Sequence, residues 1–164
     1  MTQRARSYRK RWPGKILGEL TAFLRERHGG EMNEREIAKV LGCTQQNVCS
    51  MFIHDDMRLR KAEWIAEAYG YTLELYFPKK QFFFEDQLPP PHKTSYPNSG
   101  NLLGLTEYML DSNWSVLHLS RITGCSYMAL KNAFADGDIR LSELRRCTDA
   151  IKITCVWKFV KKNT

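Results

Sequence analysis

Residues 36–52 read Glu-Ile-Ala-Lys-Val-Leu-Gly-Cys-Thr-Gln-Gln-Asn-Val-Cys-Ser-Met-Phe and carry the clearest structural signal in the chain. Gly42 is suited to end a helix over 34–41, because glycine tolerates the left-handed conformation found at helix C-termini. Thr44 is a favourable N-cap, and it predicts a second helix from Gln45 to about Phe52. Two short helices joined by a glycine-containing turn are typical of a helix-turn-helix.

The same pattern occurs twice. Residues 36–77 align with residues 118–159 at a constant offset of 82, without a gap. The alignment matches Gly42-Cys43 with Gly124-Cys125, and it keeps the flanking apolar positions in register. We interpret this as a degenerate tandem duplication.

Each copy is expected to consist of helices followed by one strand. The first copy predicts a helix that starts near Ile16 and stops before Gly29, a helix over 59–69 and a strand over 71–77. The second copy predicts helices after two capping serines and a strand over 151–159. The expected caps are Asn33, in a capping box with Glu36, and Thr44, Ser115 and Ser126. The expected inner faces of the first pair are Ile37, Val40 and Leu41, then Val48, Met51 and Phe52.

Residues 36–52 resemble the helix-turn-helix of the phage lambda repressor and Cro-like regulators, the XRE family, through Ala38, Gly42, Thr44-Gln45 and Val48. Residues 119–134 are similar to it but match less closely. The resemblance implies a mainly α fold with two lambda-repressor-like domains, each ending in a β-strand. It also implies that the helix after the turn lies in the major groove and presents its N-terminal residues to base edges.

Carried over to this chain, the resemblance implies base contacts from Gln45, Gln46, Asn47 and Ser50. Glutamine and asparagine amides can bridge N6 and N7 of adenine, so the residue types suit the role. The alternative is that these side chains only solvate an exposed helix face. In the second copy the equivalent region holds Tyr127, Met128, Lys131 and Asn132, which could contact thymine methyl groups or form a protein-binding surface.

The net charge of +7 is concentrated at the start of the chain, because residues 1–15 hold six basic residues and no acidic one. Such an arm often binds nucleic-acid phosphates, although it could also be a solubilising tail. The phosphate contacts expected of this protein are Arg4, Arg6, Arg9, Lys10 and Arg11 of the arm, with Arg35 and Lys39.

Several other classes are not supported. No apolar run approaches the ~20 residues of a membrane-spanning helix, and the first residues lack the apolar region of a secretory signal. The five cysteines form no CxxC pair, and the four histidines are scattered, so we expect a reducing cytoplasm, no metal and no cofactor. No nucleophile–base set, phosphate-binding glycine loop or carboxylate pair indicates an enzyme.

The chain is expected to divide into a basic arm (1–15), a first helix-turn-helix domain (16–78), a linker (79–100) and a second domain (101–164). The linker combines Phe82-Phe83-Phe84 with several prolines. Three consecutive phenylalanines seldom stay solvated, so they are expected to cover a seam between the copies or to dock a partner.

A lone strand leaves its backbone groups unpaired, so we expect antiparallel pairing of 71–77 with 151–159. The residues expected at this junction are Leu73, Leu75, Phe77, Ile153 and Trp157. This pairing would relate the copies by a pseudo-two-fold axis, and the two reading helices would have to lie ~34 Å apart to meet successive major grooves. The alternative is a homodimer in which each strand pairs with a second chain.

The sequence therefore predicts a sequence-specific DNA-binding transcriptional regulator, a repressor of phage or mobile-element type, that binds a pseudo-palindromic site in double-stranded DNA. The alternative is a helix-turn-helix scaffold redirected to a protein or RNA partner, such as an inhibitor of a host defence (CRISPR-type) nuclease.

Overall fold

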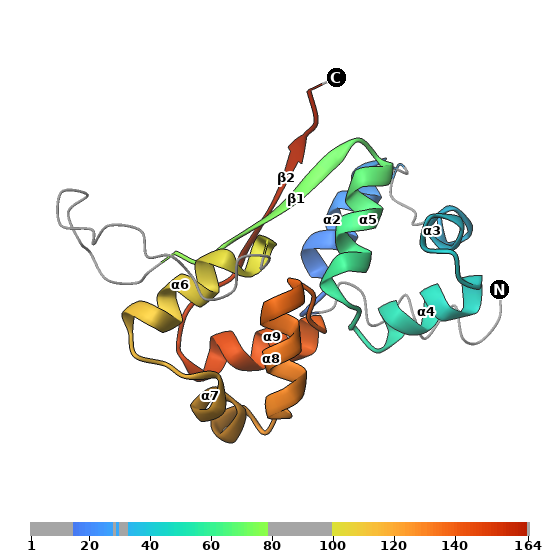
Figure 1. Ribbon diagram of the computed structural model, residues 1–164. Helices are drawn as coiled ribbons and strands as arrows, with labels where there is room; N and C mark the ends of the chain where they lie inside the picture. Colours follow the sequence, from blue (N-terminus) through green and yellow to red (C-terminus); the bar gives the residue numbers. More distant parts are fainter. Residues whose placement is uncertain (1–14, 28, 30–32, 79–99, 164) are drawn as a thin grey trace. The chain divides into compact units, whose positions relative to one another are not determined.

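The computed structural model describes residues 15–27, 29, 33–78 and 100–163 (Figure 1). This part of the chain is mainly α-helical, with a two-stranded antiparallel sheet, so the predicted fold class and the pairing of the strands are confirmed. The predictions for the arm residues 1–14 and for Phe82-Phe83-Phe84 fall outside the described residues. Among the described helices, none has the length and apolar character required to span a bilayer.

The first half of the chain forms α2 (Gly18–Arg27), α3 (Glu34–Leu41), α4 (Gln45–Ile53), α5 (Leu59–Ala68) and β1 (Tyr71–Tyr76). The second half forms α6 (Leu103–Asp111), after a short 3-10 turn over Gly100–Leu102, then α7 (Val116–Thr123), α8 (Tyr127–Asp136), α9 (Leu141–Ala150) and β2 (Val156–Lys161).

The chain folds into two compact units. Unit 1 holds the described residues up to Leu73, together with Arg140–Ser142 and the chain from Phe159 onward. Unit 2 holds the described residues of 74–139 and 143–158. Each strand therefore contributes residues to both units. The domain boundaries predicted from the sequence stay a prediction.

The four expected caps are confirmed. Asn33, Thr44, Ser115 and Ser126 each accept a hydrogen bond from the backbone N–H three residues later. Gly42 and Gly124 end α3 and α7 in the left-handed conformation, with φ of 65° and 76°. The helix boundaries near the turns follow from these local interactions.

The core of unit 1 is built by leucine and isoleucine side chains that are fully or almost fully buried. They include Leu17, Leu20, Leu24, Ile37, Leu59 and Ile65. The expected inner face of α3 was wrong at Val40, which is 40% exposed, whereas Ala38 is buried. Because successive helical residues are rotated by about 100°, Val40 points about 110° away from the middle of the face set by Ile37, Ala38 and Leu41.

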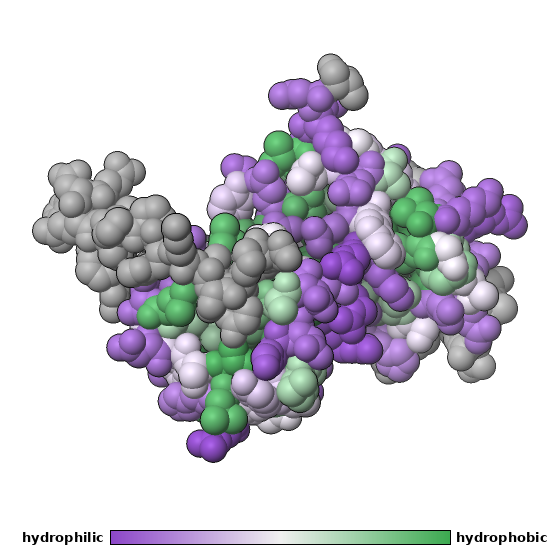
Figure 2. All heavy atoms as spheres, in the orientation of Figure 1, coloured by the Kyte–Doolittle hydropathy of each residue, from purple (hydrophilic) through white to green (hydrophobic). Residues whose placement is uncertain are grey.

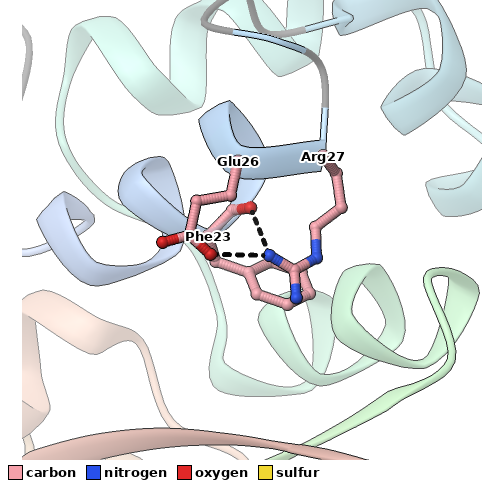
Figure 3. Close-up of polar contacts among 3 residues, drawn as sticks. All are labelled: Phe23, Glu26 and Arg27. Atoms are coloured by element: carbon pink, nitrogen blue, oxygen red, sulfur yellow. Dashed lines mark hydrogen bonds and ion pairs between the residues drawn. The ribbon is translucent and has the colours of Figure 1, made fainter.

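An aromatic cluster in unit 1 joins α2 to both strands. The Phe23 ring stacks on Phe159 of β2 at 4.2 Å and meets Tyr71 of β1 edge-on at 5.2 Å. The Arg27 guanidinium lies 4.0 Å from the centre of the Phe23 ring and 4.3 Å from that of Tyr71. It also donates to the Phe23 carbonyl and to Glu26 Oε2, at 3.3 Å and 2.9 Å (Figure 3). Arg27 therefore has a structural role.

Unit 2 has an equivalent core. Its fully buried side chains include Leu102, Leu105, Leu119, Leu130 and Phe134. Leu130 and Phe134 lie one turn apart on α8, as Val48 and Phe52 do on α4, and all four are buried. The second copy thus anchors its helix at the positions equivalent to those of the first.

A hydrogen bond just outside the strands shows the register of β1 and β2: the Lys162 N–H donates to the Gly70 carbonyl at 2.9 Å. In this register Leu73 lies opposite Phe159, and Leu75 lies opposite Trp157. Leu73 and Leu75 are buried, and Trp157 is half-buried. The N–H of Leu75 points to the outer edge of β1, where the Asn101 side-chain oxygen accepts it at 3.1 Å. The three residues therefore lie in the sheet, as predicted.

The predicted second strand, 151–159, was wrong in its bounds, because β2 is Val156–Lys161 and Ile153 precedes it. Lys152 has φ of 58°, and the Ile153 N–H donates to the Thr148 carbonyl at 3.0 Å. These bonds end α9 in a Schellman motif, in which an apolar residue follows the left-handed one. Ile153 is buried as part of this helix end. The alternation of Ile151 and Ile153, from which a strand was predicted, therefore belongs to the end of α9.

Phe77 also lies outside the sheet, since β1 ends at Tyr76, the residue opposite the first residue of β2. The half-buried Phe77 packs against α6, where a Cβ added to Gly104 would lie 3.2 Å from Phe77 Cδ2. A side chain at position 104 would therefore require the Phe77 ring to shift by a few tenths of an ångström.

Candidate nucleic-acid interface

The turn between α3 and α4 fixes how α4 is presented. The Cys43 N–H donates to the Ala38 carbonyl at 3.1 Å, closing the C-terminus of α3 around Gly42. Thr44, two residues after that glycine, caps α4: its Oγ1 accepts the Asn47 N–H at 3.1 Å. Val48 and Phe52 then hold the buried side of α4 in the core. The N-terminal turn of α4 is therefore held at both its cap and its inner face.

The four residues predicted to read bases are all exposed on α4. Gln45, Gln46 and Asn47 occupy its first turn and Ser50 its next. Helix α4 carries no charged residue, so the chemistry of its outer face consists of amide and hydroxyl groups. Such groups can donate and accept hydrogen bonds at base edges.

Positive charge lies on the preceding helix. Arg35 and Lys39, four residues apart on α3, are both exposed, and so is Glu36 between them. Glu36 accepts a hydrogen bond of 3.4 Å from the Tyr69 hydroxyl, which follows α5. Partial burial and the neighbouring Glu36 carboxylate raise the pKa of Tyr69 to about 12. The hydrogen bond ties α3 to the end of α5.

Helices α7 and α8 repeat the arrangement in unit 2. Ser126 Oγ accepts the Ala129 N–H at 3.4 Å, and the turn is braced by Ser120 Oγ, which donates to the Cys125 carbonyl at 2.6 Å. The residues predicted for the second copy lie exposed on α8: Tyr127, Met128, Lys131 and Asn132. The scaffold is thus equivalent, but its surface chemistry differs.

The offset of 82 allows the two surfaces to be compared position by position. Gln45, Gln46 and Asn47 correspond to Tyr127, Met128 and Ala129. Arg35 corresponds to Leu117, which is 45% exposed, while Met128 is 56% exposed. Figure 2 shows apolar residues at the surface over the region of α6 and α7. The first copy therefore presents a polar face where the second presents a largely apolar one.

Two aspartates to which the sequence assigned no role make specific contacts in unit 1. The Asp55 carboxylate accepts the N–H groups of Ile16 and Leu17, both at 2.8 Å, just before α2. Asp56 accepts the N–H and hydroxyl of Ser142, at 2.9 Å and 2.7 Å, in the first turn of α9. The only signal for these contacts in the sequence was the match of Asp56 with Asp138 in the repeat.

Substituting Thr44 by alanine removes the cap of α4, because the Asn47 N–H loses its acceptor. We expect the free energy of unfolding to fall by about 1 kcal/mol. Chemical denaturation measures the change in the free energy of unfolding. Ser142→Ala is not a suitable control, because it breaks a hydrogen bond of its own. Thr154→Ala, at an exposed position outside every helix and strand, should change stability by less than ~0.5 kcal/mol. A loss for Thr44→Ala no larger than for the control would contradict the capping role.

Two of the cysteines are expected to be unreactive in the native protein. Burial, with Cys125 and Glu143 nearby, raises the pKa of the Cys147 thiol to about 12, and burial raises the pKa of Cys155 to about 12 as well. Because the thiolate is the nucleophile, iodoacetamide at pH 8 should leave Cys147 and Cys155 unmodified in the native protein. Mass spectrometry of tryptic peptides measures this, and all five cysteines should react in denaturant. Rapid native labelling of Cys147 would contradict the packing described here.

Within the described part of the chain, no group of three or more His, Cys, Asp or Glu side chains is placed to hold a metal ion. Comparison of the chain with protein-family models, curated proteins and solved structures finds no match.

Proposed function

We propose that this protein is a sequence-specific DNA-binding transcriptional regulator, of phage-repressor type, that inserts α4 into the major groove. The observation that supports this most is the arrangement of α4. Thr44 caps it, Val48 and Phe52 are buried, and Gln45, Gln46 and Asn47 are exposed side by side at its N-terminus. Such a regulator would act in the cytoplasm, where the DNA it controls lies.

The chemistry of α4 suits adenine-containing sites. A glutamine or asparagine amide can donate to N7 and accept from N6 of one adenine, and each such bidentate pair contributes ~1–3 kcal/mol of discrimination. Ser50 lies next along the exposed face and can donate or accept. Because α4 has no charged residue, affinity for phosphates must come from elsewhere, and α3 carries the basic residues Arg35 and Lys39.

Deleting residues 1–11 removes five positive charges: Arg4, Arg6, Arg9, Lys10 and Arg11. If the arm binds phosphates, binding to every DNA sequence should weaken, and the slope of log K against log salt should fall by ~0.9 for each phosphate that the arm had neutralised. Binding isotherms at several salt concentrations measure the slope. An unchanged slope would indicate that the arm is a solubilising tail that does not contact phosphates.

The proposal is tested by selecting bound sequences from random DNA duplexes with the purified full-length protein. We expect a consensus that contains adenines and that disappears in Gln45→Ala/Gln46→Ala. Failure to enrich any sequence over several rounds, with a folded protein, would contradict sequence-specific binding.

A second candidate function, binding of a protein partner, is favoured by the apolar face of unit 2. Leu117, Tyr127 and Met128 are exposed at positions equivalent to Arg35, Gln45 and Gln46 of the first copy. A leucine side chain has no donor or charge for a phosphate. The variant Tyr127→Ala/Met128→Ala separates the candidates, because it alters the selected DNA sequence only if α8 reads bases in a pseudo-palindromic site. An unaltered selection would favour the protein partner for this copy.

A further inference from the structure

The outer side of α7 in unit 2 combines exposed apolar side chains with a positive charge. We call it the α7 face, and its residues are Trp114, Leu117, His118, Arg121 and Ile122. On the helix, Leu117 and Arg121 lie four residues apart, as do His118 and Ile122. At about 100° per residue, these four side chains occupy an arc of about 140°. Leu117 is 45% and Ile122 49% exposed, and Figure 2 shows apolar residues at the surface over α7.

Trp114 extends this face beyond the start of the helix. Its N–H donates to the Met109 carbonyl of α6 at 2.8 Å, directly after Asn113, which has φ of 58°. The Trp114 ring lies 4.8 Å from the His118 ring. The half-buried indole is therefore held beside the first turn of α7, and its apolar surface adjoins the exposed side of the helix.

The α7 face carries positive charge and no negative charge. Helix α7 has no acidic residue, and the sequence has none between Asp111 and Asp136. Arg121 is exposed, and within the described part of the chain no carboxylate forms an ion pair with its guanidinium. A surface of this kind is complementary to an amphipathic segment that carries carboxylates beside its apolar side chains.

Contact with DNA would not use the apolar part of this face. The first helix of a helix-turn-helix bound to DNA crosses the phosphate backbone. Leu117 and Ile122 have no donor or charge for a phosphate, whereas contact with apolar side chains of a protein would remove both from water. A symmetric pairing of two α7 faces would bring together two patches of the same charge, which opposes self-association.

We propose that the α7 face binds an acidic, amphipathic helix of a partner protein. Leu117 and Ile122 are about 7.5 Å apart along the helix axis, so apolar residues one turn apart on the partner helix can pack against both. A carboxylate that flanks those residues can pair with Arg121. The inference rests on the second candidate function, for which it specifies the partner, and it does not depend on base reading by α4.

The test begins with a displayed library of helical peptides selected on the full-length protein. The positions on one side of each peptide vary between leucine and serine, and the flanking positions vary among glutamate, lysine and serine. We expect the enriched peptides to carry leucines one turn apart, flanked by glutamates. Fluorescence anisotropy then measures the affinity of the best acidic peptide and of its counterpart with lysine in place of every glutamate.

Two variants test the apolar and the charged part of the face separately. Leu117→Ser/Ile122→Ser should weaken binding of the acidic peptide about tenfold or more, whereas Val156→Ser, at an exposed valine of β2, should not. Arg121→Glu should weaken it about tenfold and strengthen binding of the lysine counterpart.

The control for the charge reversal is Arg146→Glu, at an exposed arginine of α9 in the same unit. It changes the net charge equally and should keep the preference for the acidic peptide. The side chains replaced in all four variants are exposed, so circular dichroism should show melting temperatures close to that of the wild-type protein.

Enrichment of basic or uncharged peptides, or of none, would overturn the inference, as would wild-type affinity for the acidic peptide in both test variants. A larger loss of DNA affinity in Arg121→Glu than in Arg146→Glu, with a reduced salt slope, would assign the face to phosphates and also overturn it. So would a dimer, detected by sedimentation, that Leu117→Ser/Ile122→Ser abolishes. Failure to select any DNA sequence is a different result, because it overturns the proposed function and leaves this inference standing.

Discussion

The variant Gln45→Ala/Gln46→Ala should lose selective DNA binding while it stays folded. Each amide that spans an adenine contributes ~1–3 kcal/mol, so the double variant should bind its selected site roughly 30-fold or more weakly and approach the affinity for unrelated DNA. Both side chains are exposed, so the melting temperature should be almost unchanged. Titration of labelled duplexes measures the two affinities.

The control for this experiment is Glu67→Gln, an exposed position on α5 in the same unit. It should leave selectivity unchanged. If the Gln45→Ala/Gln46→Ala protein binds the selected site as tightly and as selectively as the parent, then α4 is not a base reader, and the exposed amides only solvate the helix.

The variant Leu73→Ala should destabilise the protein strongly, because Leu73 is 2% exposed in β1 and lies opposite Phe159 of β2. Truncating a buried leucine leaves a cavity, and we expect the free energy of unfolding to fall by about 2–5 kcal/mol. Urea denaturation followed by circular dichroism measures the change.

Val160→Thr on β2 is the matched control, because Val160 is 38% exposed. It should change stability by no more than ~0.5 kcal/mol. If Leu73→Ala were as mild as this control, the strand would not be packed into the core as described.

The features that the sequence predicted well are local. Each cap, such as Thr44 to the Asn47 N–H, joins residues three positions apart, so the pattern of residue types contains the interaction. The left-handed Gly42 and Gly124 belong to the same class, because glycine at the end of a helical pattern has a direct conformational reason.

The features that the sequence did not predict are contacts between distant residues. Asp56 meets Ser142 across 86 positions, and Asp55 meets the chain before α2 across 38 or 39. Nothing in the neighbouring residues specifies such partners. The bounds of β2 were missed for a different, local reason. Ile151 and Ile153 alternate as in a strand, yet Lys152 adopts a left-handed conformation at a helix end, a place where glycine is the expected residue.

Unit 1, which contains the candidate site, likewise has features that the sequence predicted and features that it did not. The exposure of Gln45, Gln46 and Asn47 followed from the helical period and the cap, so their position on the surface could be anticipated. The antiparallel bridge between Arg58 and Arg140 in unit 1 could not be anticipated, because it joins residues that lie far apart in the sequence.

Footprinting of the purified full-length protein on the DNA upstream of its own gene tests the central claim most directly. The account predicts protection of a short, defined segment with adenines in the major groove, abolished by Gln45→Ala/Gln46→Ala and unaffected by Glu67→Gln. Uniform protection that is the same for the wild-type protein and the double variant would contradict sequence-specific reading by α4.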